Sequence, residues 1–322
     1  MRAVHITSLA GPTALEVVEV AEPAAGPDSV VIDVHVAGVT FPEVLQSRGE
    51  YQVKPPLPFI PGSEVAGVIR SAPEGSGLEP GQRVAAFPAL GGFAEVVATQ
   101  PGMVFPLPDA VSFEVGASLP MNYLTVHFGL VRRGQLRSGD TVLVHGAAGG
   151  IGTAAVQLAS ALGARVIAVV SSAEKTEAAK AAGADEVVLA DGFKDAVKGL
   201  TGGRGVDIVV DPVGGDRFTD SLRSLAREGR LLVIGFTGGE IPQVKVNRLL
   251  LNNISVVGVG WGAFWMPQPS YLQEQWAELL PLLEAGKLDP VLGRSFPLVG
   301  ASDALLELDE RRATGKVLLT VR

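Results

Sequence analysis

The feature that most constrains the fold of this chain is a glycine-rich turn. It lies between residues with the pattern of a strand and residues with the pattern of a helix. Residues 141–145 (TVLVH) are apolar enough for a buried strand, residues 146–152 (GAAGGIG) form the turn, and small apolar residues follow at helical spacing. Glycine in such a turn lets a ligand approach the backbone, and a helix N-terminus offers free N–H groups to an anion. The order predicts a dinucleotide-binding βαβ unit. The residues expected to contact the cofactor here are Ala148, Gly149, Gly150, Ile151 and Gly152.

The tip of the next strand, residues 165–170, indicates which dinucleotide the loop takes. An NAD-dependent enzyme is expected to carry Asp or Glu about 20 residues after the glycine turn, where the carboxylate binds the ribose 2′-hydroxyl. This chain has Ser171, Ser172 and, shortly after, Lys175. Hydroxyls and an ammonium group would bind a 2′-phosphate that a carboxylate would repel, so NADPH is predicted over NADH. The alternative is that these residues are an N-cap and a solvated lysine of the following helix.

Composition bounds the class of protein. A length of 322 residues suggests about two domains. With 47% hydrophobic and 19% charged residues the chain can build a large core, and its net charge of −8 argues against a nucleic-acid surface. No apolar run approaches the roughly 20 residues of a membrane span, and the N-terminus reads as a strand rather than a signal peptide, so a cytoplasmic protein is expected.

The chain has no cysteine and only four histidines. The lack of cysteine excludes disulfides, thiol nucleophiles and cysteine-ligated metals. The histidines are scattered and form no i, i+4 pair, so no metal site is expected.

The predicted secondary structure changes near residue 120, from short strands to strands that alternate with helices. Before it, short runs bounded by Gly or Pro predict the strands of a barrel-like domain: 15–20, 29–36, 64–69, 83–87 and 93–98. After it, six strands alternate with helical segments such as 173–182 and 218–226, which predicts a doubly wound parallel sheet. Those strands are 141–145, 165–170, 186–189, 206–210, 230–234 and 254–260. Helices over 271–285 and 302–312 and strands near 296 and over 317–321 complete the prediction.

Five motifs together resemble the medium-chain dehydrogenase/reductase superfamily, in its zinc-free quinone oxidoreductase (zeta-crystallin-like) branch. They are 61–67 (PGSEVAG), 145–152 (HGAAGGIG), 182–185 (AGAD), 211–215 (DPVGG) and 312–316 (RATGK). The resemblance implies an α/β protein with a GroES-like β-barrel domain and a Rossmann domain with a doubly wound parallel sheet, with the active site in the cleft between them. It implies that residues 1–122 are the N-terminal part of the catalytic domain, 123–262 the NADPH-binding domain and 263–322 the return to the catalytic domain.

Two positions distinguish this chain from the zinc-dependent members that it resembles. Thr40 and Ser63 stand where those members carry a cysteine and a histidine, and neither can replace them as a zinc ligand. A metal-free reductase of a conjugated acceptor is therefore implied, since alcohol oxidation would lack its usual Lewis acid. The chain departs from the branch at Thr40, where quinone reductases usually have Asn, and at Ala190, where a Tyr often borders the 2′-phosphate.

The resemblance also implies roles for individual side chains. Thr40, Glu43 and Tyr51 would face the substrate, with Tyr51 able to donate a hydrogen bond to an oxygen that gains negative charge. Tyr51 could instead only pack at the domain seam, and Glu43 could be a structural or pocket-rim carboxylate.

Six further residues are expected near the cofactor. By resemblance, Thr125 lies near the nicotinamide ribose, Arg312 reaches toward the 2′-phosphate and Lys316 lies on the nicotinamide side. Thr125 could instead bond the preceding turn of its own helix. Phe236, Val259 and Trp261 follow late strands of the Rossmann domain and should border the nicotinamide.

The sequence and the resemblance together predict an NADPH-dependent, zinc-independent quinone oxidoreductase that acts on a quinone or conjugated carbonyl. An enoyl or alkenal double-bond reductase on the same scaffold and a non-catalytic NADPH-binding protein are the alternatives. The apolar segment 253–258 resembles an edge strand that pairs across a two-fold axis, so a homodimer is expected.

Overall fold

The computed structural model describes residues 1–322, which divide into two compact units. One unit comprises residues 1–121, 269–277 and 292–322, and the other comprises residues 122–268 and 278–291. The sequence predicted a single segment from 263 to 322, but the chain changes units within this segment. The division into three segments therefore stays a prediction. Each unit is described by itself.

The second unit is built on a six-stranded sheet in the order β10-β9-β8-β11-β12-β13, with every neighbouring pair parallel. This confirms the predicted doubly wound sheet and places β13 at an edge. The strands are β8 Thr141–His145, β9 Arg165–Val170, β10 Glu186–Leu189, β11 Val206–Asp211, β12 Leu225–Val233 and β13 Ser255–Gly258. Ala226, expected at the end of a helix, lies in β12, because its helix ends at Arg223 and the strand begins two residues later.

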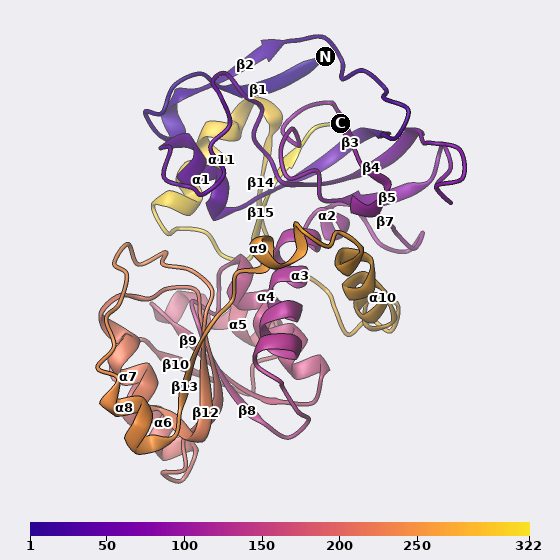
Figure 1. Cartoon of the computed structure of the whole chain (residues 1–322). Coiled ribbons are helices and arrows are strands. Elements are labelled where there is room, and N and C mark those ends of the chain that lie inside the picture. The colour runs from indigo at the N-terminus through magenta and orange to yellow at the C-terminus, as the bar shows by residue number, and fades with distance from the viewer. The chain divides into compact units, whose positions relative to one another are not determined.

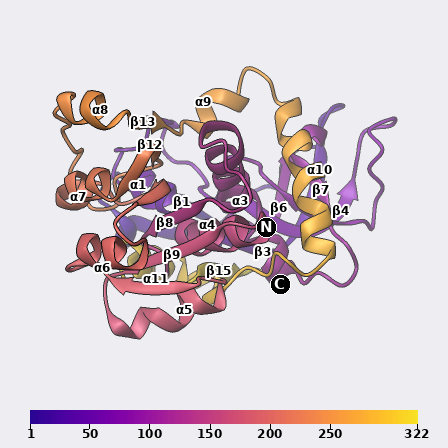
Figure 2. The ribbon, with the colours of Figure 1, turned by 90° about the horizontal axis from the view of Figure 1, so that it is seen from below.

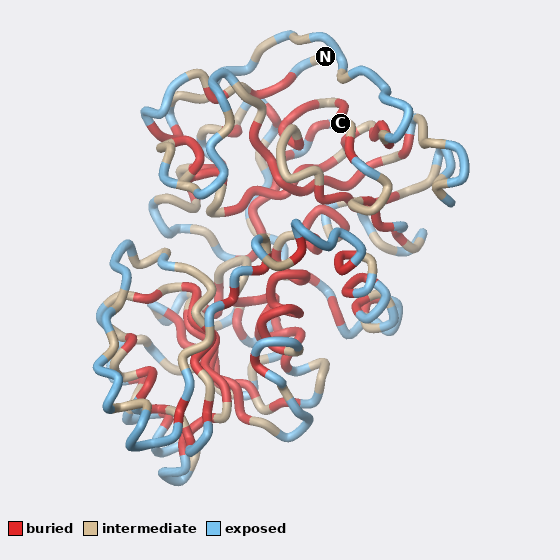
Figure 3. The backbone as a smooth tube through the Cα atoms, in the orientation of Figure 1, coloured by how far each residue is buried: buried red, intermediate tan, exposed pale blue.

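Helices cover both faces of this sheet. Helices α4 and α5 lie on one side of it and α6, α7 and α8 on the other (Figure 1). The helices are α4 Gly150–Ala161, α5 Thr176–Ala181, α6 Phe193–Leu200, α7 Phe218–Arg223, α8 Asn247–Asn252 and α9 Trp261–Trp265, with short turns at Ala173–Lys175 and Gly215–Arg217. Strands β8, β9 and β11 are almost wholly buried, which explains their unbroken runs of Val, Ile and Leu (Figure 3).

Two helices contain residues of both units. Helix α3 spans Pro120–His127 and continues as a π-helical segment, Phe128–Arg133, and α10 spans Ser270–Glu284. In the second unit, the Tyr123 hydroxyl donates to Gln157 Oε1 at 2.6 Å, and Gln157 also bonds the backbone of Asp289. This buried network fixes the start of α3 against α4.

The first unit is a mixed β structure, as predicted for the barrel-like domain. Its seven-stranded sheet has the order β14-β15-β3-β4-β5-β7, with β6 also paired to β3, and β1 and β2 form a separate antiparallel pair. The long strand β3 accommodates three partners, because β6 pairs with its first half and β15 with its second. The elements are β1 Arg2–Ile6, β2 Leu15–Glu19, β3 Val30–Val39, β4 Glu64–Ser71, β5 Arg83–Ala86, β6 Val96–Thr99, β7 Val104–Pro106, β14 Leu292–Pro297, β15 Lys316–Thr320, α1 Phe41–Ser47, α2 Phe113–Gly116 and α11 Ala301–Asp309, with short turns at Pro12–Ala14, Pro101–Met103 and Leu298–Gly300. Helix α11 also contributes to the apolar core of this sheet, and its ribbon lies beside β15 (Figure 2).

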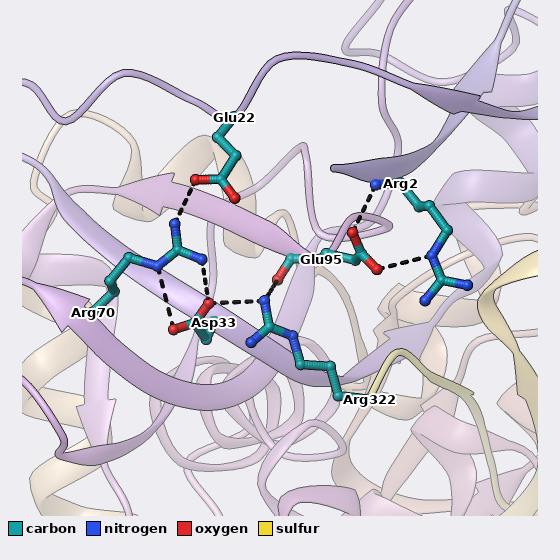
Figure 4. Close-up of polar contacts among 6 residues, drawn as sticks. All are labelled: Arg2, Glu22, Asp33, Arg70, Glu95 and Arg322. Carbon is teal, nitrogen blue, oxygen red and sulfur yellow. Dashed lines mark hydrogen bonds and ion pairs between the residues drawn. The ribbon is translucent and has the colours of Figure 1, made fainter.

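A chain of ion pairs joins the two ends of the polypeptide to this sheet (Figure 4). Arg2 pairs with Glu95 at 2.8 Å, and Arg322 pairs with Asp33 at the same distance. Arg70 bridges Asp33 and Glu22 from the opposite side. The arginine partners lower the pKa of both the Asp33 and Glu95 carboxyls, so the pairs are intact at neutral pH.

Candidate functional site

The glycine loop joins the end of β8 to the start of α4. Gly146 has a φ of 60°, and Gly149 is the N-cap of α4 with no side chain to cap it. A Cβ on Gly152 would lie 2.0 Å from the Gly146 carbonyl oxygen, which no side chain can accommodate without moving the backbone. Glycine at 152 therefore fixes the close approach between the helix and the turn that precedes it.

Three backbone donors of this loop form no hydrogen bond with a protein acceptor. The Gly149 N–H bonds Gly146, the Thr153 N–H bonds Gly149, and Gly149 also takes part in a β-bridge, whereas the N–H groups of Ala148, Ile151 and Gly152 are unpaired. No acidic side chain occupies the first turn of α4. Free N–H groups and the positive end of the helix dipole together favour an anion. The loop thus fits the pyrophosphate of a dinucleotide, with the predicted loop residues grouped at one helix end.

Ser171 and Ser172 lie where the sequence placed them, just past the end of β9. Ser172 is the N-cap of the Ala173–Lys175 turn, yet its side chain makes no capping hydrogen bond, and the Ser171 side chain is exposed. Ser172 thus takes the N-cap position that the alternative reading gave it, although its side chain caps no N–H group. The predicted contact of Ser171, Ser172 and Lys175 with a 2′-phosphate stays a prediction.

Helix α3 brings two polar side chains to this unit at i and i+3, which share one helix face. Thr125 is only 8% exposed, and its hydroxyl makes no bond to the preceding turn, so the structural alternative weighed for it is absent. Asn122 lies against the start of α4, where a Cβ on Gly150 would meet its Nδ2 at 2.8 Å. Asn122 was not predicted from the sequence, and the available signal was its position one turn before Thr125.

Phe236, Val259 and Trp261 follow strands β12 and β13, so they lie at the carboxyl edge of the sheet, where the glycine loop also lies. Phe236 is 37% exposed and packs near Gly214, whereas Val259 and Trp261 are buried. The Trp261 and Trp265 rings lie 5.9 Å apart in a tilted arrangement. Their predicted contact with the nicotinamide stays a prediction.

In the first unit, Thr40, Glu43 and Ser63 form one buried cluster. Thr40 is the N-cap of α1, Pro42 stands in the first turn, and Glu43 is the third helical residue, which explains locally why the helix begins here. Glu43 Oε2 accepts bonds from the Thr40 N–H, at 2.7 Å, and from the Thr40 hydroxyl. Glu43 Oε1 accepts bonds from the Ser63 N–H at 3.0 Å and the Ser63 hydroxyl at 2.7 Å. Glu43 is 1% exposed, so all its accepting capacity is used within the protein.

This cluster bears on the predicted catalytic roles. The positions that would carry two zinc ligands in zinc-dependent relatives both bond the carboxylate of Glu43 instead. Glu43 thus orders the loop and the start of α1, which agrees with the structural reading considered for it. The described residues contain no group of three or more His, Cys, Asp or Glu side chains able to hold a metal ion.

Tyr51 follows α1 and is partly buried. Burial, with a smaller contribution from the Glu43 carboxylate, raises the pKa of its phenol. The hydroxyl therefore stays protonated through the neutral range and can donate a hydrogen bond.

Lys316 and Arg312 lie in the first unit as well. Lys316 is 3% exposed and pairs with the fully buried Glu64, which also accepts the Met121 N–H at 2.7 Å. Burial raises the pKa of the Glu64 carboxyl, and Lys316 opposes the rise. Arg312 is half exposed and pairs with Glu307 and Glu310. Both cations are thus paired with carboxylates of the protein, and their predicted contacts with the cofactor stay predictions.

Comparison with known proteins connects both units to one family. A family model described as a zinc-binding dehydrogenase matches residues 150–285, and one described as an alcohol dehydrogenase GroES-like domain matches residues 26–109. Quinone oxidoreductase-like protein 2 of Rattus norvegicus is 40% identical over 325 aligned positions, which cover 100% of this chain and 92% of the rat protein. The chain belongs to the medium-chain dehydrogenase/reductase superfamily, in its zinc-free quinone oxidoreductase branch.

Two solved structures have the same fold. The quinone oxidoreductase of Thermus thermophilus, whose structures include a complex with NADPH, has a TM-score of 0.87 and 37% identity over the whole of both chains. A probable oxidoreductase from Mycobacterium abscessus has a TM-score of 0.92 and 48% identity, covering 100% of this chain and 99% of that one. These likenesses confirm the predicted GroES-like and Rossmann fold class. None of the described helices has the length and apolar character needed to cross a bilayer.

Proposed function

We propose that this oxidoreductase uses NADPH to reduce a quinone without zinc. The observation that carries the proposal is the set of three unpaired N–H groups at the start of α4, next to a strand tip that bears two serines and a lysine. The first feature suits a dinucleotide pyrophosphate and the second a 2′-phosphate. NADPH contains both, and the Thermus thermophilus relative was solved with it.

When bound, NADPH supplies a hydride from C4 of its nicotinamide. The chain's own residues bind the cofactor, orient an acceptor and stabilise the charge that develops on it. Tyr51 donates a hydrogen bond to the acceptor oxygen, a role that its raised pKa preserves at neutral pH. Thr40 and Ser63 contribute through Glu43, which holds the loop before α1 in place.

A quinone suits this machinery better than an alcohol. Alkoxide formation needs a strong electrophile such as zinc, whereas a quinone is already electron-poor and needs only hydrogen-bond donors at its oxygens.

The test measures NADPH consumption at 340 nm with four acceptors: 1,4-benzoquinone, 9,10-phenanthrenequinone, an alkenal and an enoyl thioester. Turnover of the two quinones at a kcat/KM at least about tenfold above the other acceptors supports the proposal. Faster turnover of the alkenal or thioester indicates a double-bond reductase. NADPH binding, seen by its fluorescence, with no turnover of any acceptor indicates a non-catalytic binding protein. A lower KM for NADH than for NADPH overturns the choice of cofactor.

We also propose that the protein is a homodimer that pairs through β13. This strand is an edge of the parallel sheet, and the neighbouring segment exposes large apolar side chains: Ile241, Val246, Leu250 and Leu251. An unprotected edge beside exposed apolar surface is costly in a monomer. Light scattering at micromolar concentration should give the mass of two chains, and a monomeric mass would exclude the proposal. Val256→Pro, which blocks pairing at the edge, should give monomers.

A further inference from the structure

The side chain of Asn122 is largely buried, and its amide has no hydrogen-bond partner within the protein. The residue is 5% exposed, and its Nδ2 and Oδ1 do not belong to the fully enclosed side-chain atoms that lack a partner. The amide therefore reaches the surface of the unit, where a ligand or a water can bond it. Its surroundings indicate which.

Asn122 lies directly against the first residue of α4. A Cβ on Gly150 would be 2.8 Å from Nδ2 and 3.7 Å from Oδ1, so only glycine leaves room for the amide there. An asparagine beside a helix N-terminus commonly accepts a backbone N–H as a cap. Asn122 accepts none, although the N–H groups of Ile151 and Gly152 are both unpaired. The amide donor and the helix donors are thus left together for one acceptor.

We propose that Asn122 is a cofactor-binding residue that donates from Nδ2 to a pyrophosphate oxygen of the dinucleotide. The inference rests on the proposed use of NADPH and adds a side-chain donor to the backbone donors of the loop. Thr125 shares the face of α3 that carries Asn122. Helix α3 therefore contributes to the phosphate site as well as to the ribose contact predicted for Thr125.

The test separates the pyrophosphate from the 2′-phosphate with two ligands that lack the nicotinamide. 2′-Phospho-ADP-ribose contains both groups, and adenosine 2′-monophosphate contains only the 2′-phosphate. Isothermal titration with Asn122→Ala should show a Kd for 2′-phospho-ADP-ribose about tenfold weaker than wild type, with the Kd for adenosine 2′-monophosphate unchanged. Alanine is a good helix former and no protein hydrogen bond is lost, so the variant should fold.

Asn122→Asp distinguishes a phosphate contact from a merely structural role. A carboxylate at the start of α4 interacts favourably with the helix dipole, so Tm should stay level or rise. The same carboxylate repels a pyrophosphate, so the Kd for 2′-phospho-ADP-ribose should weaken by about a hundredfold. Asn252→Ala is the matched control, because Asn252 lies on α8 and bonds Arg248, and it should leave both affinities unchanged.

Wild-type affinity for 2′-phospho-ADP-ribose in Asn122→Ala, or a fall in Tm of Asn122→Asp with unchanged affinity, would overturn the inference and leave the proposed function standing. Failure of the wild-type protein to bind either ligand would instead count against the proposed use of NADPH, and with it against this inference.

Discussion

The two polar regions of this protein differ in how their hydrogen bonds are used. Around Thr40, Glu43 and Ser63 in the first unit, the carboxylate oxygens are saturated by protein donors. At the start of α4 in the second unit, the backbone donors and the Asn122 amide have no protein acceptor. Buried polar groups are nearly always paired in a folded protein. A saturated cluster is therefore complete without a ligand, whereas an unsaturated one indicates where a ligand binds.

The region at the start of α4, whose donors are unpaired, should be the more sensitive to an added side-chain atom. Gly152→Ala places a Cβ 2.0 Å from the Gly146 carbonyl oxygen, so the turn must open and its donors lose their alignment. We expect the Kd for NADPH, followed by fluorescence, to weaken by more than about a hundredfold. Gly199→Ala is the control, because a Cβ on Gly199 of α6 meets no atom within 4 Å. Equal affinity of the two variants would show that the close approach at Gly152 is not required.

A buried ion pair next to the saturated cluster, formed by Lys316 and Glu64, should respond in stability rather than in cofactor affinity. Lys316→Met leaves the fully buried Glu64 without its counter-ion, and losing one partner of a buried pair costs about 3–5 kcal/mol. Urea unfolding should show this loss. Lys316→Met combined with Glu64→Gln should recover part of it, since no charge is then buried.

This loss should also depend on pH. Burial already raises the pKa of the Glu64 carboxyl, and removing Lys316 raises it further. A carboxyl whose folded-state pKa is raised favours the folded state at low pH and loses that contribution as pH rises through the folded-state value. Lys316→Met should therefore be less destabilised at pH 5 than at pH 8. A large loss of NADPH affinity without a loss of stability would instead support the predicted contact of Lys316 with the cofactor.

Tyr51 tests whether the first unit contributes chemistry as well as structure. Tyr51→Phe removes a donor without changing shape, and we expect kcat for a quinone to fall about tenfold to a hundredfold with the Kd for NADPH unchanged. Because the pKa of Tyr51 is raised, the wild-type kcat should not fall between pH 6 and about pH 9 through loss of this proton. A rate unchanged by the substitution would leave Tyr51 as a packing residue.

The smallest effect is expected at the surface ion pairs. Arg70 and Arg322 lower the pKa of Asp33, so the stability they contribute is present above the unfolded pKa and is lost as pH falls through the folded value. Asp33→Asn should lower the unfolding free energy by about 1 kcal/mol or less at pH 7. At a pH near 3, the difference from wild type should shrink in parallel unfolding curves.

Much of the fold could be predicted because the spacing of the apolar residues and the positions of Gly and Pro indicate the same element boundaries. The apolar runs of β8, β9 and β10 were predicted within the same residue bounds that the structure shows. The helix preceding β12 was predicted too long, since no Gly or Pro stands between Leu222 and Ala226 to mark where helical spacing gives way to a strand. Helix α1 was not anticipated, because its start depends on the bond between Glu43 and the Thr40 backbone rather than on an apolar stripe.

The candidate site could be predicted only where residues that are close in the sequence determine its chemistry. A strand, a glycine turn and a helix fix free N–H groups at known positions, so the loop residues could be named from the sequence. The bonds from Ser63 to Glu43 and from Lys316 to Glu64 join residues 20 and 252 positions apart, and no periodicity reports such pairs. Asn122 escaped for the same reason, because its burial against Gly150 depends on how α3 packs beside α4.

The most direct measurement is an ¹⁵N TROSY titration of the protein with 2′-phospho-ADP-ribose. The difference between the two regions predicts downfield amide shifts at Ala148, Ile151 and Gly152, together with a shift of the Asn122 side-chain amide. The backbone amides of Thr40 and Ser63, whose N–H groups already bond Glu43, should not move. Shifts confined to Thr40 and Ser63, or an unchanged glycine loop at saturating ligand, would contradict the assignment of the unpaired donors to a dinucleotide.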